Sequence, residues 1–321
     1  MKTGKIFINL FLLLLLFTLS GAKPVIVLKD KVYRHAGMTA RELKCGYFRA
    51  GKFYSIARGN ENFVFRPERA DFRCSGVSVA GSFPVRNWGN SLYLSALDVN
   101  TILRPLFATS QSVRRHAVRR IILDPGHGGF DRGAAGKVII EKNLTLKLAR
   151  RIAEILKRCG YTCLLTRSKD HLIPLVQRSA AANRARGDIF VSLHCNASKD
   201  PRAFGIETYC LTPAGASSTN QKRISEASFS GNAFDANNFL LAFEVQKSLL
   251  QRTRSQDRGV RRGRFAVLRN LNMPGILVEV GFVSNRAEEN RLAALPYQEQ
   301  LARAIAVGII NYHRRIYNSS R

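Results

Sequence analysis

The spacing of hydrophobic and polar residues predicts a β-rich segment in the first third of the chain. Between residues 23 and 108, short runs of mixed apolar and polar residues are separated by Gly, Pro and Asn, as in strands joined by tight turns. The predicted strands are Val25–Leu28, Lys52–Ile56, Asn62–Phe65, Gly76–Val79 and Ser91–Leu94, with a short helix over Leu97–Leu106. We therefore expect a small all-β module here.

From Arg119 onward, short apolar runs alternate with longer segments that have helical spacing. The predicted strands are Arg120–Leu123, Thr162–Leu165, Asp188–Leu193, Gly205–Leu211, Ala266–Leu268 and Gly275–Val280. The predicted helices are Asn143–Lys157, Leu175–Arg186, Phe239–Arg252 and Gln298–Ile316. Strands that alternate with helices indicate an α/β fold with a mixed, largely parallel sheet flanked by helices. A second domain is expected over residues 119–317.

Two segments have neither pattern. Residues 109–118 are small and polar, then basic, and we expect a linker between the module at 23–108 and the α/β domain. Thr212–Asn238 is polar and rich in Ser and Asn, and we expect a loop. Structureless loops longer than about 12–15 residues are usually functional or disordered.

The N-terminus has the three parts of a secretory signal peptide. Lys2 and Lys5 precede the apolar run Ile6–Leu19, and the small residues Ser20–Ala22 follow it. The run is shorter than the ~20 apolar residues that span a bilayer comfortably. We expect residues 1–22 to be cleaved and the protein to be exported to the periplasm, the cell envelope or the medium, with no stable membrane span afterwards. An uncleaved anchor is the alternative.

Composition narrows the choice of partners. The 321 residues include 51 Lys and Arg against 22 Asp and Glu, a formal charge of +29, and 45% are hydrophobic. This hydrophobic content excludes a disordered chain, and the single long apolar run excludes a polytopic membrane protein. The positive charge favours an anionic polymer as partner. Export argues against nucleic acid, so anionic lipid and an acidic cell wall remain as candidate partners.

The six cysteines permit disulfides in an exported chain. Cys45 and Cys74 lie in the same β-rich segment and could pair with each other. The other four are interpreted at least as well as small buried side chains: Cys159, Cys163, Cys195 and Cys210.

Four polar residues lie where an α/β fold places its active site. His127 and His194 each follow a predicted strand, Glu279 lies in the last apolar strand, and Glu141 opens the first helix. Ligands bind at the carboxyl ends of strands in such sheets. Two imidazoles and one carboxylate make a zinc site with an open fourth position, and a second carboxylate can take a proton from the attacking water. The four residues therefore predict a zinc hydrolase with three ligands and one base.

Several blocks of sequence resemble the zinc-dependent N-acetylmuramoyl-L-alanine amidases of the bacterial cell wall. The order and spacing of the blocks agree from Arg119 to the C-terminal helix. They are Ile121–Gly129, Glu141–Leu144, Leu165–Arg167 with Asp170, Leu175–Arg178 through Asn183, Phe190–Ala197, Gly205–Tyr209 and Pro274–Asn285.

The resemblance implies one Zn²⁺ per catalytic domain, held by His127, Glu141 and His194, with Glu279 as the catalytic carboxylate. It implies an amidase that hydrolyses the amide bond between N-acetylmuramic acid and the L-alanine of the stem peptide in peptidoglycan, for cell-wall remodelling or cell separation. Residues 23–106 resemble, more weakly, a small β-sandwich module that binds peptidoglycan or envelope partners. An envelope activator protein is therefore a further candidate partner.

Other polar residues allow two interpretations. Arg178, Asn183 and Asn196 are candidates for binding substrate, and surface polar residues are the alternative. Regulated members of the family have an inserted helix over the zinc where this chain has Thr212–Asn238, and we expect an unrestrained loop here instead. A basic patch either steers acidic substrate or is a solvated loop; it consists of Arg258, Arg261, Arg262 and Arg264.

Two other functions remain open from the residues alone. A zinc peptidase that cleaves within the stem peptide would use the same chemistry on another bond. A non-enzymatic wall-binding protein would use only the positive charge, and its binding would be sensitive to salt and indifferent to chelators. The four-residue constellation argues against this second alternative.

Overall fold

The computed structural model describes residues 22–107, 112–114, 116–219 and 221–318. The predicted signal peptide lies outside the described residues except for its last residue. The chain forms two compact units: one comprises the residues up to 75 and 81–107, and the other comprises 76–80 and the residues after 107. The domain limits proposed from the sequence stay a prediction.

The first unit contains two small antiparallel sheets. One has the order β1 (Val25–Leu28), β2 (Lys31–His35), β9 (Ser91–Ser95) and β8 (Arg86–Trp88). The other is a meander of β3 (Gly46–Ala50), β4 (Phe53–Arg58), β5 (Glu61–Phe65) and β6 (Asp71–Cys74). Alternation places one face of this meander inside, with Ile56, Phe63 and Phe72 buried. The helical segments are α2 (Ala36–Glu42), α3 (Ala96–Asp98), η2 (Val99–Leu103) and α4 (Arg104–Phe107).

The second unit is built on a mixed sheet, as the sequence predicts. Its strands are β10 (Arg120–Pro125), β11 (Thr162–Leu165), β12 (Ile189–Asn196), β13 (Ile206–Leu211), β16 (Asp257–Gly263) and β17 (Gly275–Phe282). Their order is β11-β10-β12-β17-β13-β16, and β7 (Val77–Ala80) pairs with β16. Neighbours in this row are parallel except β13 and β17, which are antiparallel.

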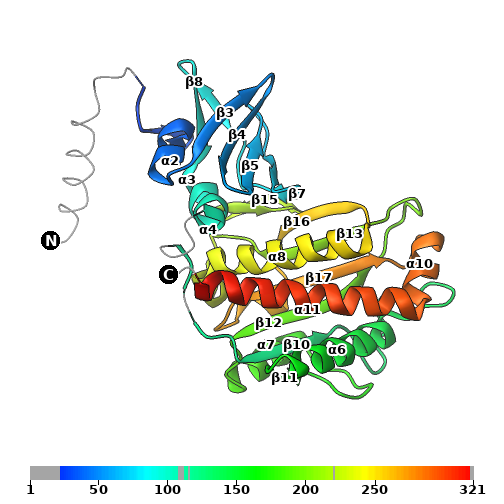
Figure 1. Cartoon of the computed structure of the whole chain (residues 1–321). Coiled ribbons are helices and arrows are strands. Elements are labelled where there is room, and N and C mark those ends of the chain that lie inside the picture. The colour runs from blue at the N-terminus through cyan, green and yellow to red at the C-terminus, as the bar shows by residue number, and fades with distance from the viewer. Residues whose placement is uncertain (1–21, 108–111, 115, 220, 319–321) are drawn as a thin grey trace. The chain divides into compact units, whose positions relative to one another are not determined.

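Helices cover both faces of this sheet. On one face, α6 (Glu141–Arg158) packs on β10 to β12, α8 (Asp235–Thr253) packs on β13, β16 and β17, and α11 (Leu295–Asn318) packs on both helices (Figure 1). On the other face, α7 (Leu175–Arg184) and α9 (Ala266–Arg269) close a core that includes Ile122, Phe190 and Leu277. The α/β prediction is confirmed. Among the described residues, no helix combines the length and apolar character needed to cross a membrane.

The helix that carries Glu141 illustrates how the pattern specifies structure. In α6 the residues Leu144, Leu148, Ile152 and Leu156 recur every four positions and are all buried. The helix ends at Arg158 with Cys159 as its C-cap, and Gly160 follows in the left-handed region with φ 87°. These boundaries fix Glu141 in the first turn, at the end that faces the strand termini.

Several expectations from the sequence are wrong. Ala266–Leu268 is helical rather than a strand. Outside Thr212–Asn238, the second unit also contains β16 and α10 (Arg286–Ala293), which the sequence does not predict. The unpredicted elements of the first unit are β2, β3, β6, β8 and α2. Cys45 and Cys74 form no disulfide with each other; Cys74 is buried, and the Cys45 thiol contacts the Leu43 carbonyl.

Thr212–Asn238 is not an unrestrained loop. It contains the hairpin β14 (Ala216–Ser218) and β15 (Gln221–Ser225), the turn η3 (Ser230–Phe234) and the start of α8. The Arg264 guanidinium fixes the hairpin by donating from Nη2 to the carbonyls of Pro213, Ala216 and Ser225 at 2.7–3.3 Å. Strand β13 runs antiparallel to β17. Thr212–Asn238, which follows β13, therefore starts at the end of the sheet opposite to the carboxyl ends of β12 and β17.

Candidate metal centre and active site

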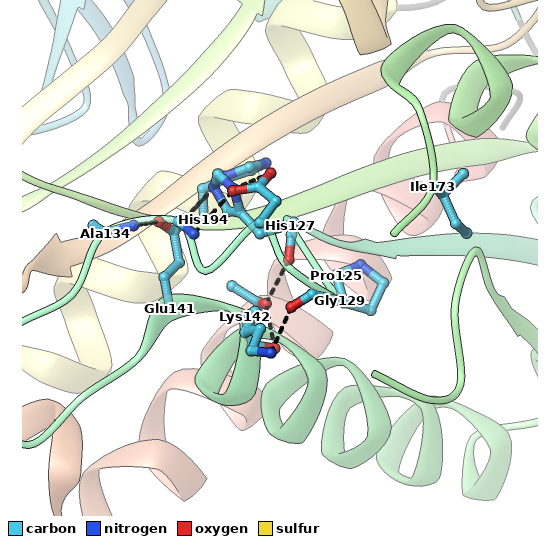
Figure 2. A network of polar contacts seen from close by, with 12 residues as sticks. Pro125, His127, Gly129, Ala134, Glu141, Lys142, Ile173 and His194 are labelled. Atoms are coloured by element: carbon cyan, nitrogen blue, oxygen red, sulfur yellow. Dashed lines mark hydrogen bonds and ion pairs between the residues drawn. The ribbon is translucent and has the colours of Figure 1, made fainter. Parts of the chain in front are cut away.

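Three of the four predicted residues meet at the carboxyl ends of β10 and β12. His127 lies in the turn after β10, His194 lies near the end of β12, and Glu141 lies in the first turn of α6 (Figure 2). One nitrogen or oxygen from each lies within 4.8 Å of the other two, so the cluster could hold a metal ion. The predicted grouping of these three residues is therefore present in the fold.

The Glu141 carboxylate is the centre of this cluster. Its Oε1 atom lies 3.2 Å from His127 Nε2 and 3.0 Å from His194 Nδ1, and it also accepts from the Cys195 backbone N–H at 2.8 Å. Its Oε2 atom accepts from the Ala134 N–H at 2.7 Å. Burial alone would raise the pKa of Glu141, but its contacts with the two imidazoles outweigh burial and lower that pKa to about 2.

His127 is held from its other nitrogen. Its Nδ1 atom lies 2.8 Å from the Asp131 carboxylate, which leaves Nε2 directed at the cluster. Burial lowers the pKa of His127, but the Glu141 and Asp131 carboxylates raise it above its ordinary value. The donor set of a zinc site with a free position consists of two imidazole nitrogens and one carboxylate oxygen. In such sites a second carboxylate often orients one of the imidazoles, as Asp131 orients His127 here.

Two glycines allow the close approach of these side chains. A Cβ atom at Gly126 would lie 2.3 Å from the His194 ring, and one at Gly133 would lie 2.5 Å from Glu141 Oε2. His127 itself has a positive φ of 61°. Position 133 therefore requires glycine for two reasons: a Cβ atom would clash with Glu141, and the φ of 65° is unfavourable for other residues.

Two buried arginines hold the turn that carries His127. Arg178 donates to the Asp124 carboxylate and to the carbonyls of Pro125 and His127 at 2.7–2.8 Å. Arg167 donates to the carbonyls of Pro125 and Gly126 at 3.0 and 2.8 Å. The Arg178 side chain is only 2% exposed, so it supports the turn from beneath rather than meeting substrate as predicted. Arg167 lies in the block Leu165–Arg167, but the sequence alone predicts no role for it.

Glu279 lies beside the cluster without belonging to it. It is the register partner of His194 on β12 and of Glu207 on β13. Its Oε2 atom is out of contact with solvent and has no hydrogen-bond partner among the described residues. Burial raises the pKa of Glu279 well above its ordinary value, and the charges of Glu141 and Glu207 raise it further. A buried carboxyl oxygen without a donor is chemically free to accept a proton.

Glu207 is a polar residue that the sequence analysis missed. Its Oε1 atom accepts from Asn196 Nδ2 and from the Tyr209 hydroxyl at 2.8 and 2.9 Å. Its Oε2 atom accepts from Arg258 Nε and Arg261 Nη1 at 3.0 and 2.9 Å. The signal was present, because Glu207 interrupts an apolar strand just as Glu279 does. Of the two interpretations of the basic patch, the solvated loop is wrong for Arg258 and Arg261, because both lie on strand β16.

The remaining predicted substrate residues lie in different places. Asn196 lies two residues after His194 and donates to Glu207, so it lies at the site beside these two residues. Asn183 donates to the Asn270 carbonyl at 2.7 Å and accepts from the Asn272 N–H at 2.9 Å. Those partners lie just before the first residue of β17, at the end of the sheet opposite to the metal cluster. Asn183 is therefore remote from that cluster.

Comparison with known proteins gives a consistent result for the second unit. A family model described as N-acetylmuramoyl-L-alanine amidase matches residues 121–311. The amidase AmiA of Escherichia coli K12 is 32% identical over 219 residues, which covers 60% of this chain and 76% of AmiA. An amidase structure from Clostridium difficile 630 has 32% identity and a TM-score of 0.52, covering 61% of this chain and 97% of that one.

A further solved structure includes a second protein. The CwlD amidase from Clostridioides difficile, in complex with the GerS lipoprotein, has 27% identity and a TM-score of 0.51. The match covers 60% of this chain and 98% of CwlD.

Proposed function

The chain belongs to the N-acetylmuramoyl-L-alanine amidase family, and we propose that it uses one Zn²⁺ to hydrolyse the bond between N-acetylmuramic acid and L-alanine in peptidoglycan. The observation that carries this proposal is the convergence of His127, Glu141 and His194, whose donor atoms lie within 4.8 Å of one another. Family membership supports the bond, and the donor set supports the metal.

The residues present fit a zinc ion. Two neutral imidazoles and one ionised carboxylate are the ligand types that zinc prefers in catalytic sites, and three protein ligands leave a position for water. When bound, zinc lowers the pKa of its water to about 7. The low pKa of Glu141 keeps this carboxylate ionised and ready to bind a cation at neutral pH.

Glu279 is proposed as the general base and then the general acid. Its unpartnered Oε2 lies on the strand beside His194, where it can take a proton from the attacking water. The same carboxyl group then gives that proton to the nitrogen of the departing L-alanine. A raised pKa suits both tasks, because a group that holds a proton well is both an effective base and a usable acid near neutral pH.

The cellular setting is part of the same proposal. Export through residues 1–22 would bring the enzyme to the cell wall, where its positive charge favours an acidic polymer. Residues 23–108 are proposed to hold the enzyme at peptidoglycan or an envelope partner. The CwlD–GerS structure supports the idea that a relative in this family works with a lipoprotein partner, so an envelope activator is proposed here as well. The expected role is cell-wall remodelling or cell separation.

One experiment tests the reaction and the metal together. The protein without residues 1–22 is incubated with purified peptidoglycan, with and without a chelator, and the products are identified by mass spectrometry. New L-alanine amino termini that vanish with the chelator and return with Zn²⁺ are expected. Cleavage between stem residues would instead support a zinc peptidase. Binding without cleavage, unaffected by the chelator, would support a wall-binding protein and contradict the proposal.

A further inference from the structure

We propose that Arg258 and Arg261 bind a free carboxylate of the substrate's stem peptide, on the side of the departing amine. This inference rests on the proposed amidase function and adds the part of the substrate that the site recognises. Arg258 and Arg261 belong to the basic patch and lie on β16, which is separated by β13 alone from the strand that carries Glu279.

The two arginines extend a row of polar residues across the sheet. His194 on β12 is in register with Glu279 on β17, Glu279 with Glu207 on β13, and Glu207 with Gly259 on β16. Arg258 and Arg261 flank this last position and both donate to Glu207 Oε2. The row therefore leads from the metal cluster, past the proposed base, to two guanidinium groups.

Glu207 orients the arginines without using up their charge or their donors. Its Oε2 atom accepts one N–H from each, at 3.0 Å from Arg258 and 2.9 Å from Arg261. Two cations thus share one carboxylate, which leaves one unit of positive charge. Among the described residues, neither Nη2 group has a hydrogen-bond acceptor, and the two side chains are 31% and 24% exposed. A second carboxylate is the ligand that this arrangement fits.

Aromatic rings hold the planes of the guanidinium groups. The Arg258 guanidinium lies 4.7 Å from the centre of the Phe282 ring, and the Arg261 guanidinium lies 5.9 Å from the Tyr209 ring. A guanidinium group that is stacked on a ring and bonded to a carboxylate loses little further freedom when it binds a second carboxylate. The pair is therefore prepared for a ligand before the ligand arrives.

The distance suits the first residues of a stem peptide. Strand β13 lies between β17 and β16, and strands are ~4.8 Å apart, so β16 is about 10 Å from the strand of Glu279. An extended peptide advances ~3.3–3.6 Å per residue. A peptide whose amide nitrogen lies at Glu279 therefore brings its second or third residue to the arginines. Stem peptides are acidic, so a carboxylate within those residues is the expected ligand.

The test uses three soluble muropeptides: one with free carboxylates, one amidated at the second stem residue and one amidated at the third. The wild-type protein is expected to lose about tenfold to a hundredfold in kcat/KM on one amidated substrate, the size expected for losing charged hydrogen bonds. Arg258→Gln and Arg261→Gln should lose a similar factor on the free substrate and no longer discriminate. Arg252→Gln, an exposed arginine on α8, is the matched control and should keep the preference.

The possible outcomes separate this inference from the proposed function. Cleavage of all three substrates by the wild type with equal kcat/KM contradicts the inference alone, whereas cleavage of none contradicts the function and the inference with it. Arg258→Lys keeps the positive charge and should retain part of the preference. If Arg258→Gln and Arg261→Gln lose the same factor on every substrate together with a lower melting temperature, the arginines are structural and the inference is wrong.

Discussion

His194 and Glu279 are Cα partners on the adjacent parallel strands β12 and β17. Strands in a sheet are ~4.8 Å apart, so the pairing fixes Glu279 next to a proposed metal ligand. Glu141, in contrast, approaches the same histidine from the first turn of α6 and contacts its ring directly. Two glutamates therefore reach one histidine in different ways: one contacts its nitrogen, and the other lies beside it with a free oxygen.

This difference predicts separate effects for the two glutamates. Glu279→Gln keeps the shape of the side chain but removes its basicity, so turnover should fall by about 10²–10⁴-fold while zinc stays bound. Glu141→Gln removes a charged ligand and should lower zinc content and activity together, as should replacement of His127 or His194. Metal analysis beside kinetics on a soluble muropeptide distinguishes the cases. Loss of zinc from Glu279→Gln would make Glu279 a ligand, and near-normal turnover would remove it from the mechanism.

Arg178 should matter for the metal although it is not expected to touch the metal or the substrate. A lysine at this position cannot reach the Asp124 carboxylate and the carbonyls of Pro125 and His127 together. Each buried acceptor left without a donor costs about 1–3 kcal/mol, so Arg178→Lys should lower the free energy of unfolding by about 2–4 kcal/mol. Zinc affinity should fall as well, because the His127 turn loosens.

Arg184→Lys is the control for this prediction, since Arg184 is exposed on the same helix. Denaturant unfolding and a competitive chelator titration measure the two effects. An Arg178→Lys protein with wild-type zinc affinity and stability would show that the turn does not depend on this arginine.

The sequence could predict elements that bury a regular apolar pattern. The four-residue repeat in α6 and the apolar runs of β12 and β17 each specify an element, and the polar residues at their ends then identify the site. Strand β16 was missed because its charged residues find partners far away in the chain. Arg261 is separated from Glu207 by more than fifty positions, and no local pattern reveals that contact.

The same limit applies to the roles of single residues. Arg178 and Asn183 lie on one helix, and the sequence makes both of them candidates for binding substrate. In the structure, Arg178 supports the His127 turn and Asn183 bonds to the segment before β17. A polar residue in the sequence indicates only that its side chain needs a hydrogen-bond partner or solvent. Which partner it finds depends on how the sheet brings distant segments together.

Exposed aromatic residues of the first unit should contribute to binding of the cell wall. Phe48 and Phe53, on β3 and β4, are 58% and 43% exposed, and the Arg66 guanidinium lies 5.6 Å from the Phe53 ring. Phe48→Ser with Phe53→Ser should weaken binding to purified sacculi by about tenfold, because an aromatic contact contributes about 0.5–1.5 kcal/mol. Turnover of soluble muropeptides should not change.

Trp88→Ser, which removes an exposed aromatic residue from β8 in the other sheet, is the matched control for sacculus binding. Sedimentation of the protein with sacculi measures this binding. Equal binding by the wild type and the double variant would exclude this face as the attachment surface.

Asp235 should make the stability of the second unit depend on pH. It lies in the first turn of α8 and accepts a hydrogen bond from Asn232 at 2.9 Å. Burial raises its pKa to about 6, against the opposing effects of Asn232 and Arg262. An unfolded aspartate has a pKa of about 3.9. Between these values the folded protein holds a proton that the unfolded chain has lost, so the free energy of unfolding should fall as pH rises from about 4 to about 6.

Asp235→Asn removes this titration and keeps an oxygen that can accept from Asn232. Below about pH 4 the variant and the wild type should have similar stability, because Asp235 is protonated in both states of the wild type. At pH 7 the variant should be more stable than the wild type by at most about 3 kcal/mol, because each unit of pKa shift corresponds to 1.36 kcal/mol. Solvent that reaches the Asp235 side chain reduces this difference. Denaturant unfolding from pH 4 to 7 measures the difference, with the exposed Glu154→Gln as control. Parallel stability curves for the wild type and Asp235→Asn would show that Asp235 does not carry the raised pKa.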